Sequence, residues 1–191
     1  WMKRKAAERN CAIAGSVAVC ENGNYYNRFY FVHPDGAVQH YDKKHLFTFG
    51  GEHKRFTAGT ERVVVNFRGV RILLEVCYDL RFPVWARNLG DYDMILYVAS
   101  WPTPRVDAWG ALLRARAIEN QCYVAGVNRM GVDPACEYSG GSAIIDPYGK
   151  TIAECPWSRE SAVSADIDME ALQAFRKKFP VLDDADPFTL I

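Results

Sequence analysis

Cys77 is the residue of this sequence whose surroundings best suit covalent chemistry. It ends a hydrophobic, β-prone run that begins at Leu73, and Pro83, which can open a helix, follows shortly after. A side chain on such a strand-to-helix turn projects above the sheet, where backbone N–H groups can stabilise an oxyanion. Cys77 is therefore a candidate nucleophile. A small buried core cysteine is the commoner fate of a lone Cys, and this residue alone does not decide between the two.

A thiol with an ordinary pKa of about 8.5 needs a cationic neighbour or a base to become a nucleophile near neutral pH. Lys43, Lys44 and His45 can supply one, because they lie where a predicted strand ends and a long loop begins. A Cys–Lys pair and a Cys–His dyad both fit these residue types, although the local signature of a papain-type cysteine is absent. A charged strand end that faces water is the alternative.

An α/β framework must position these side chains. Asn-Gly and Asp-Gly turns between β-prone runs indicate hairpins in the first part of the chain, and strand–helix–strand units follow. We predict one domain over residues 1–191, of the α/β class with layered, mixed sheets. The polar loop over residues 43–60 is long enough to be functional. We predict strands over residues 11–19, 25–32, 37–41, 62–67, 70–76, 94–99, 122–127, 142–145, 151–154 and 161–167, and helices over residues 1–9, 83–88, 106–121 and 169–179.

Composition excludes several classes of function. The 23 basic and 23 acidic residues balance, so no charge excess favours nucleic acid or an anionic membrane surface. No apolar stretch approaches the roughly 20 residues that a membrane-spanning helix needs. The cysteines form no Cys-x-x-Cys pair and no zinc-finger spacing with histidine, so we expect no metal and predict the reduced thiols of a cytoplasmic protein. They are Cys11, Cys20, Cys77, Cys122, Cys136 and Cys155.

Two motifs give the sequence a family resemblance. Residues 43–47 (KKHLF) resemble the lysine motif of the nitrilase superfamily, the carbon–nitrogen hydrolases, and residues 77–83 (CYDLRFP) resemble its cysteine motif. The resemblance covers essentially the whole chain and is greatest to a bacterial ω-amidase-like branch, which hydrolyses the terminal amide of small 2-oxo acid monoamides. It implies an α-β-β-α sandwich of two mixed sheets flanked by helices, and a homodimer or higher homo-oligomer. It continues through residues 100–102, 114–121, 128–129 and 140–142.

The resemblance also implies roles for individual residues. It implies a Glu–Lys–Cys triad without cofactor or metal, in which Cys77 is the nucleophile, and Lys43 and the backbone N–H of Tyr78 bind the oxyanion. The general-base glutamate is expected upstream of Trp1, which would make this chain the C-terminal three-quarters of the domain, incomplete at its N-terminus. Glu52 resembles a second family glutamate that would orient Lys43 by a charge-assisted hydrogen bond; an exposed loop carboxylate is the alternative.

The expected substrate is a small amide that carries a carboxylate away from the reacting carbonyl. Arg81 and Arg105 are candidates to bind this carboxylate, since the guanidinium donates two parallel hydrogen bonds, and Trp101 could form an apolar wall. For both arginines a structural ion pair or a solvated charge is the alternative. Another amidase or nitrilase of the superfamily, or a non-catalytic binding or assembly member of the fold, also remains open.

Overall fold

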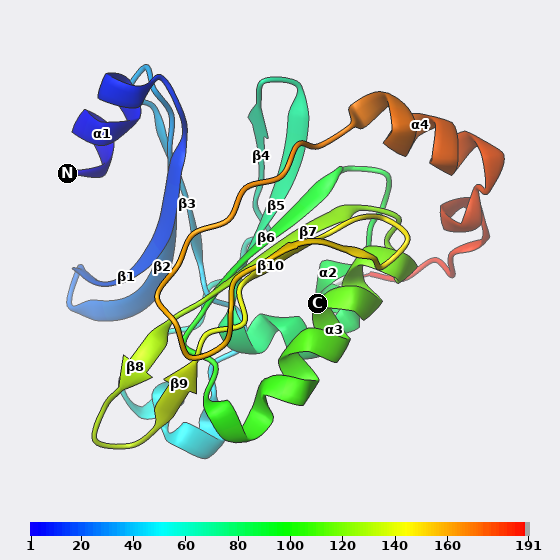
Figure 1. Cartoon of the computed structure of the whole chain (residues 1–191). Helices are drawn as coiled ribbons and strands as arrows, with labels where there is room; N and C mark the ends of the chain where they lie inside the picture. Colours follow the sequence, from blue (N-terminus) through cyan, green and yellow to red (C-terminus); the bar gives the residue numbers. More distant parts are fainter. Residues whose placement is uncertain (190–191) are drawn as a thin grey trace.

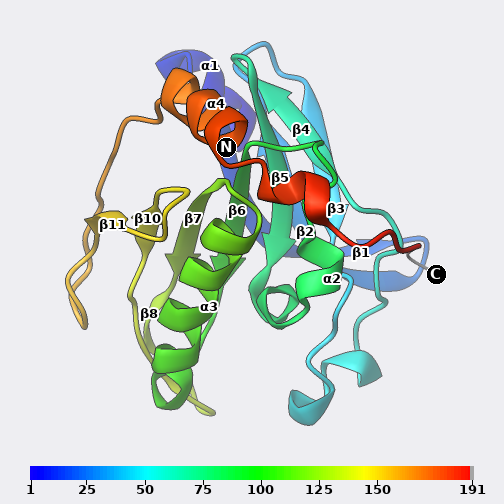
Figure 2. The ribbon, with the colours of Figure 1, turned by 90° about the vertical axis from the view of Figure 1, so that its right-hand side faces the viewer.

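Two β-sheets and a long helix form successive layers in the computed structural model, which describes residues 1–189. A three-stranded sheet lies against one face of a six-stranded sheet, and α3 covers the other face (Figures 1 and 2). The strands are β1 (Ile13–Glu21), β2 (Asn24–Val32), β3 (Val38–Asp42), β4 (Val64–Phe67), β5 (Val70–Val76), β6 (Met94–Ala99), β7 (Tyr123–Asn128), β8 (Met130–Val132), β9 (Glu137–Ser139), β10 (Ala143–Ile145) and β11 (Thr151–Glu154). The helices are α1 (Met2–Arg9), α2 (Pro83–Ala86), α3 (Val106–Glu119) and α4 (Met169–Lys178), and the 3-10 turns are η1 (Thr48–Gly50), η2 (Glu52–Lys54), η3 (Cys77–Arg81), η4 (Thr103–Arg105) and η5 (Val181–Asp184).

The three-stranded sheet has the order β1-β2-β3 and is antiparallel throughout. Its first hairpin turns at Asn22 and Gly23, whose φ angles are 50° and 79°. Positive φ at both central residues is typical of the tight hairpin turns that Asn-Gly favours, which explains why this sequence signal predicted the hairpin correctly. Its third strand, β3, ends directly before Lys43.

The six-stranded sheet is mixed, with the order β11-β10-β7-β6-β5-β4. Its central strands β5, β6 and β7 run parallel, and α2 and α3 lie in the connections between them. The carboxyl ends of these strands therefore meet at one edge, where open α/β sheets bind their ligands. Cys77 follows β5, Ser100 follows β6 and Asn128 ends β7, so all three residues lie at this edge.

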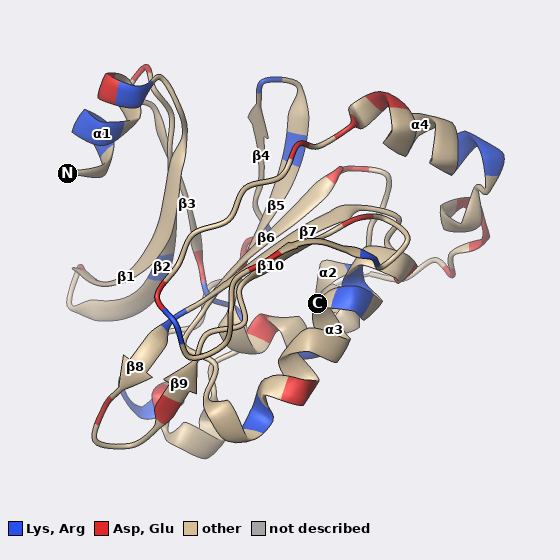
Figure 3. Cartoon of the chain, viewed as in Figure 1, with Lys and Arg blue, Asp and Glu red and all other residues tan. Residues whose placement is uncertain are grey.

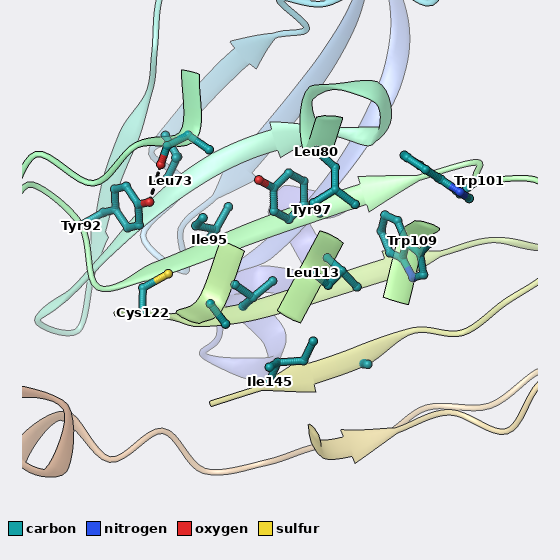
Figure 4. Close-up of a cluster of buried hydrophobic side chains, with 14 residues drawn as sticks. Leu73, Leu80, Tyr92, Ile95, Tyr97, Trp101, Trp109, Leu113, Cys122 and Ile145 are labelled. Atoms are coloured by element: carbon teal, nitrogen blue, oxygen red, sulfur yellow. Dashed lines mark hydrogen bonds between the residues drawn. The ribbon is translucent and has the colours of Figure 1, made fainter. Parts of the chain in front are cut away.

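Alternate residues of β5 face two separate hydrophobic cores. Leu74 and Val76 pack between the sheets, against side chains such as Phe29 and Tyr41 of the smaller sheet. Leu73 points to the opposite core, which α3 covers (Figure 4). Residues of α3 in this second core include Trp109, Leu113 and Ala117, as the helical pattern of residues 106–121 predicted. The fold is therefore α/β with two facing sheets, as expected.

Several predicted elements differ from the structure. Residues 161–167 form no strand and are mostly exposed, so the prediction of a last strand there was wrong; the alternating pattern of Val163, Ala165 and Ile167 fits a strand, but the segment joins none of the sheets within residues 1–189. The loop at residues 43–60 contains two 3-10 turns, and the short β8–β9 hairpin was not predicted. All six cysteines are free thiols, but only Cys122 and Cys155 are buried, and Cys20 is exposed.

The charged side chains of α4 are arranged to complement its helix dipole. Asp168 caps its N-terminus by accepting a hydrogen bond from the N–H of Ala171 at 2.8 Å, and the last turn carries Arg176, Lys177 and Lys178 (Figure 3). Acidic groups at the start of a helix and basic groups at its end are stabilising. Within residues 1–189, none of the helices has both the length and the apolar character to cross a membrane.

Candidate active site

Cys77 occupies a strained turn at the end of β5. Its φ angle of 50° lies in the left-handed region, which costs a non-glycine residue on the order of 1–3 kcal/mol. The turn is held by Asp79, whose Oδ2 accepts the N–H of Val76 at 3.0 Å and whose carbonyl accepts the N–H of Phe82 at 2.9 Å. The predicted strand-to-helix turn is confirmed, with η3 as its first helical element and α2 opening at Pro83.

Lys43 is buried, with 3 % of its side chain exposed, and forms an ion pair with Glu52. Its Nζ donates to Glu52 Oε2 at 2.6 Å, and the same oxygen accepts the backbone N–H of Phe47 at 2.6 Å. The other carboxylate oxygen of Glu52 accepts from Asn27 Nδ2 at 3.3 Å. The expected charge-assisted contact with Lys43 is therefore present, and the alternative of an exposed loop carboxylate is wrong for Glu52.

The backbone around Lys43 is fixed from two sides. Its N–H donates to the carbonyl of Asn27 at 3.0 Å, and its carbonyl accepts the N–H of Gly59 at 2.9 Å. A Cβ at Gly59 would lie 2.0 Å from the carbonyl oxygen of Asp42, so only glycine allows this close approach of the loop to the end of β3. The position of Lys43 thus depends on both ends of the long loop.

A cavity of about 670 Å³ opens at the edge where the parallel strands end. The residues to which the family resemblance and the expected substrate gave roles line it, and they come from the lysine loop, the cysteine turn and the segment after β6. The guanidinium of Arg81 lies 5.0 Å from the ring centre of Trp101, and that of Arg105 lies 5.4 Å from the ring centre of Phe47. The seven predicted residues brought together are Lys43, Glu52, Cys77, Tyr78, Arg81, Trp101 and Arg105.

His45 and Lys44 have other partners. The imidazole Nδ1 of His45 lies 2.8 Å from Asp79 Oδ1, and its ring stacks on Phe82 at 3.8 Å between centres. The ammonium of Lys44 lies 5.2 Å from the ring centre of Trp85. Neither residue lines the cavity, so the part of the chain that the structure describes provides no Cys–His dyad at Cys77.

Sequence reasoning missed residues that also form the cavity wall. Asn128 ties two segments together, because its side chain bonds both the N–H and the carbonyl of Trp101, at 2.7 and 3.0 Å, and the carbonyl of Gly140 at 2.7 Å. Arg129, Cys136 and Tyr138 come from the β8–β9 hairpin or its base. Asn128 and Arg129 lie in a segment of family resemblance, which could have identified them, whereas no sequence pattern indicated the other two.

Four cationic side chains and one carboxylate line the cavity. Glu52 is paired with Lys43, and Arg129 forms an ion pair with Asp133 at 3.3 Å. The charges of Arg81 and Arg105 therefore leave a positive surface that favours an anionic ligand. Burial raises the pKa of the Cys77 thiol, and the nearby Lys43 ammonium opposes that rise. Within residues 1–189, no group of three or more His, Cys, Asp or Glu side chains could hold a metal ion.

Known proteins share this sequence and fold. A family model described as carbon-nitrogen hydrolase matches residues 1–177. "Omega-amidase YafV" of Escherichia coli K12 is 53% identical over 100% of this chain and 75% of its own length, and the "2-oxoglutaramate amidase" of Bacillus subtilis is 41% identical over 96% and 72%. The solved structure of XC1258 from Xanthomonas campestris, described as a CN-hydrolase superfamily protein with an arsenic adduct in the active site, superposes with a TM-score of 0.96 at 47% identity, over 100% of this chain and 75% of that one. The chain belongs to the carbon-nitrogen hydrolase family.

Proposed function

We propose that this protein is an ω-amidase that hydrolyses the terminal amide of a small 2-oxo dicarboxylic acid monoamide and releases ammonia. The observation that carries the proposal is the single cavity into which Cys77 and the Lys43–Glu52 ion pair converge, with Arg81 and Arg105 in its wall. The names of the relatives in Escherichia coli and Bacillus subtilis support the same substrate class.

The sulfur of Cys77 attacks the amide carbonyl carbon, and the carbonyl π electrons move to the oxygen. The oxyanion is stabilised by the ammonium of Lys43 and by the backbone N–H of Tyr78, which lies in the first turn of η3, where a helix leaves N–H groups without intrahelical acceptors. Collapse of the tetrahedral intermediate breaks the C–N bond, and the nitrogen leaves as ammonia after gaining a proton. A water molecule then hydrolyses the thioester to the free acid and restores the thiol.

This sequence of steps requires proton transfer. Because burial raises the pKa of Cys77, the resting thiol keeps its proton near neutral pH, and a base must remove it during attack. Glu52 is the one carboxylate within residues 1–189 that lines the cavity, and its oxygens already accept hydrogen bonds from three groups, Lys43 among them. We therefore assign Glu52 to orienting Lys43 and leave proton transfer to the further glutamate that the family triad contains.

Substrate recognition is assigned to the arginines. Arg81 and Arg105 present guanidinium groups that can each bind a carboxylate with two parallel hydrogen bonds, and Trp101 forms an apolar wall beside Arg81. Replacing either arginine with glutamine is expected to raise KM for the acidic amide far more than KM for an uncharged amide of the same length.

The direct test measures ammonia release from 2-oxoglutaramate by the full-length protein. We expect Cys77→Ala to abolish turnover and Lys43→Met, which keeps the length and removes the charge, to lower kcat by at least about 10²–10³-fold. Cys20→Ala is the control, because this exposed thiol does not line the cavity and should be dispensable. Turnover that survives Cys77→Ala, or that prefers nitriles or uncharged amides across a substrate panel, would refute the assignment.

We propose two further properties, the compartment and the oligomeric state. Six free cysteines suit the reducing conditions of the cytoplasm, where the protein is expected to act. The family resemblance supports a homodimer. Measuring the molar mass of the purified full-length protein in solution by light scattering would test this.

A further inference from the structure

Asp79 is a fully buried carboxylate that lies two residues after Cys77 and does not line the cavity. Both of its oxygens are occupied. Oδ1 accepts from the backbone N–H of His45 at 2.9 Å and faces the His45 imidazole Nδ1 at 2.8 Å. Oδ2 accepts from the hydroxyl of Tyr41 at 2.9 Å and from the backbone N–H of Val76 at 3.0 Å. One side chain thus bonds three separate parts of the chain.

These partners flank the two residues that carry the proposed chemistry. Tyr41 and His45 stand two residues before and two residues after Lys43, and Val76 directly precedes Cys77. The hydroxyl of Tyr41 also accepts the backbone N–H of Lys44 at 3.0 Å, which adds a link on the lysine side. Hydrogen bonds to a buried charge are short and directional, so this carboxylate fixes both segments relative to each other.

We propose that Asp79 is the positioning residue of the active site, which holds the Lys43 ammonium beside the Cys77 sulfur without touching the substrate. The inference rests on the proposed function, since it assumes that these two groups act together on one carbonyl. A merely structural role predicts a loss of stability and leaves the remaining folded molecules fully active. A positioning role predicts folded molecules whose chemistry is slow.

Asp79→Asn is the informative substitution because the amide cannot replace the carboxylate. An amide has one acceptor oxygen and one donor nitrogen. Whichever way it faces, the nitrogen meets either the backbone N–H of His45 or that of Val76, and neither N–H can become an acceptor. The variant therefore releases either the lysine segment or the cysteine turn, while side-chain volume stays the same.

The first measurement is steady-state kinetics of the full-length protein. We expect Asp79→Asn to lower kcat by about 100-fold, as misplacement of reacting groups by about 1 Å can do. KM should change less than kcat, because Trp101 and Arg105 lie on a segment that Asp79 does not bond, although Arg81 shares the cysteine turn. Tyr41→Phe removes one of the four donors and should lower kcat by about tenfold with little change in folding. If Asp79→Asn fails to fold, the kcat of Tyr41→Phe tests the positioning role instead.

The second measurement is the rate at which iodoacetamide alkylates Cys77, followed by mass spectrometry of the peptide that contains it. The Asp79 charge raises the pKa of the thiol slightly, whereas Lys43 lowers it more strongly. Removing the Asp79 charge alone would therefore speed alkylation, and unfolding would speed it too. Slower alkylation in Asp79→Asn is the result that displacement of Lys43 predicts.

Asp93→Asn is the matched control. Asp93 is equally buried, with 2 % exposure, and its oxygens accept from Arg71 and Arg176, but it lies away from the cavity. This variant should lose stability and keep kcat. The inference is overturned if Asp79→Asn and Tyr41→Phe keep wild-type kcat, or if Cys77 is alkylated as fast as in the wild type or faster. Because alkylation needs no substrate, a wild-type protein inactive on 2-oxoglutaramate would refute the proposed function and leave this test standing.

Discussion

Glu75 offers a quantitative test of the electrostatics beneath the active site. It lies on β5 two residues before Cys77, is 0% exposed, and neither of its carboxyl oxygens has a hydrogen-bond partner within the described residues. Tyr97 lies opposite it on β6, and its buried hydroxyl also has no hydrogen-bond partner among residues 1–189 (Figure 4). Burial raises the pKa of Glu75 well above its ordinary value, and the charge of Asp79 adds to the rise. The folded protein therefore holds a proton on this group that the unfolded chain has lost.

The sign and size of the effect follow from this difference in bound protons. Between the pKa of the unfolded chain, about 4.3, and the higher pKa of the folded protein, the folded state binds one more proton at Glu75. This extra proton stabilises the folded state. The stabilisation is largest below the lower pKa, and it decreases by about 1.4 kcal/mol per pH unit as the pH rises toward the higher pKa. Glutamine has nearly the same shape and takes up no proton, so Glu75→Gln removes this dependence.

Urea unfolding of the full-length protein at half-unit steps from pH 5 to pH 7 measures the effect. We expect the stability of Glu75→Gln relative to the wild type to increase as the pH rises, by up to about 1.4 kcal/mol for each pH unit as long as the pH stays below the pKa of Glu75 in the folded protein. Glu154→Gln changes an exposed carboxylate at the edge of the same sheet and should leave the wild-type profile unchanged. Parallel profiles for Glu75→Gln and the wild type would mean that Glu75 is ionised in the folded protein and would refute the reasoning.

Three other substitutions test the packing around the site. Leu113→Ala, which empties a fully buried position of α3, should lower the free energy of unfolding by about 2–5 kcal/mol in urea titrations. Gly59→Ala places a Cβ 2.0 Å from the carbonyl oxygen of Asp42 and should lower kcat in steady-state assays by displacing the adjacent lysine segment; unchanged kcat would contradict that coupling. Asn128→Ala removes two hydrogen bonds that hold Trp101 and a third to Gly140, and should raise KM while Cys77 alkylation keeps its rate; an unaltered KM would argue against Trp101 as a binding wall.

Local signals predicted the elements that local chemistry controls. The Asn22-Gly23 turn and the apolar run that ends at Cys77 gave the first hairpin and the strand-to-helix turn, because turn geometry and strand patterning depend on neighbouring residues. The family motifs identified the candidate site residues, and in the structure these residues line one cavity. Their catalytic roles remain predictions that the substitutions above test.

Contacts between residues far apart in the chain could not be predicted from the sequence. In the sequence, Asp79 is one polar residue of a predicted turn. Only folding brings it into hydrogen-bond contact with Tyr41 and His45. Glu75 interrupts an apolar run and would ordinarily mark a solvated strand face, yet α3 covers that face. The strands of the β8–β9 hairpin are three residues each, too short for a period of two to emerge from the pattern.

The β8–β9 hairpin pairs only with itself and joins neither of the larger sheets. It nevertheless supplies part of the cavity wall through Cys136 and Tyr138, while Cys77 and Lys43 stand on the framework of the two main sheets. Insertions or exchanges in this hairpin can therefore alter which acyl group fits without disturbing the reacting pair. This part of the wall can therefore change independently of the two sheets, which would allow the same scaffold to accept new substrates.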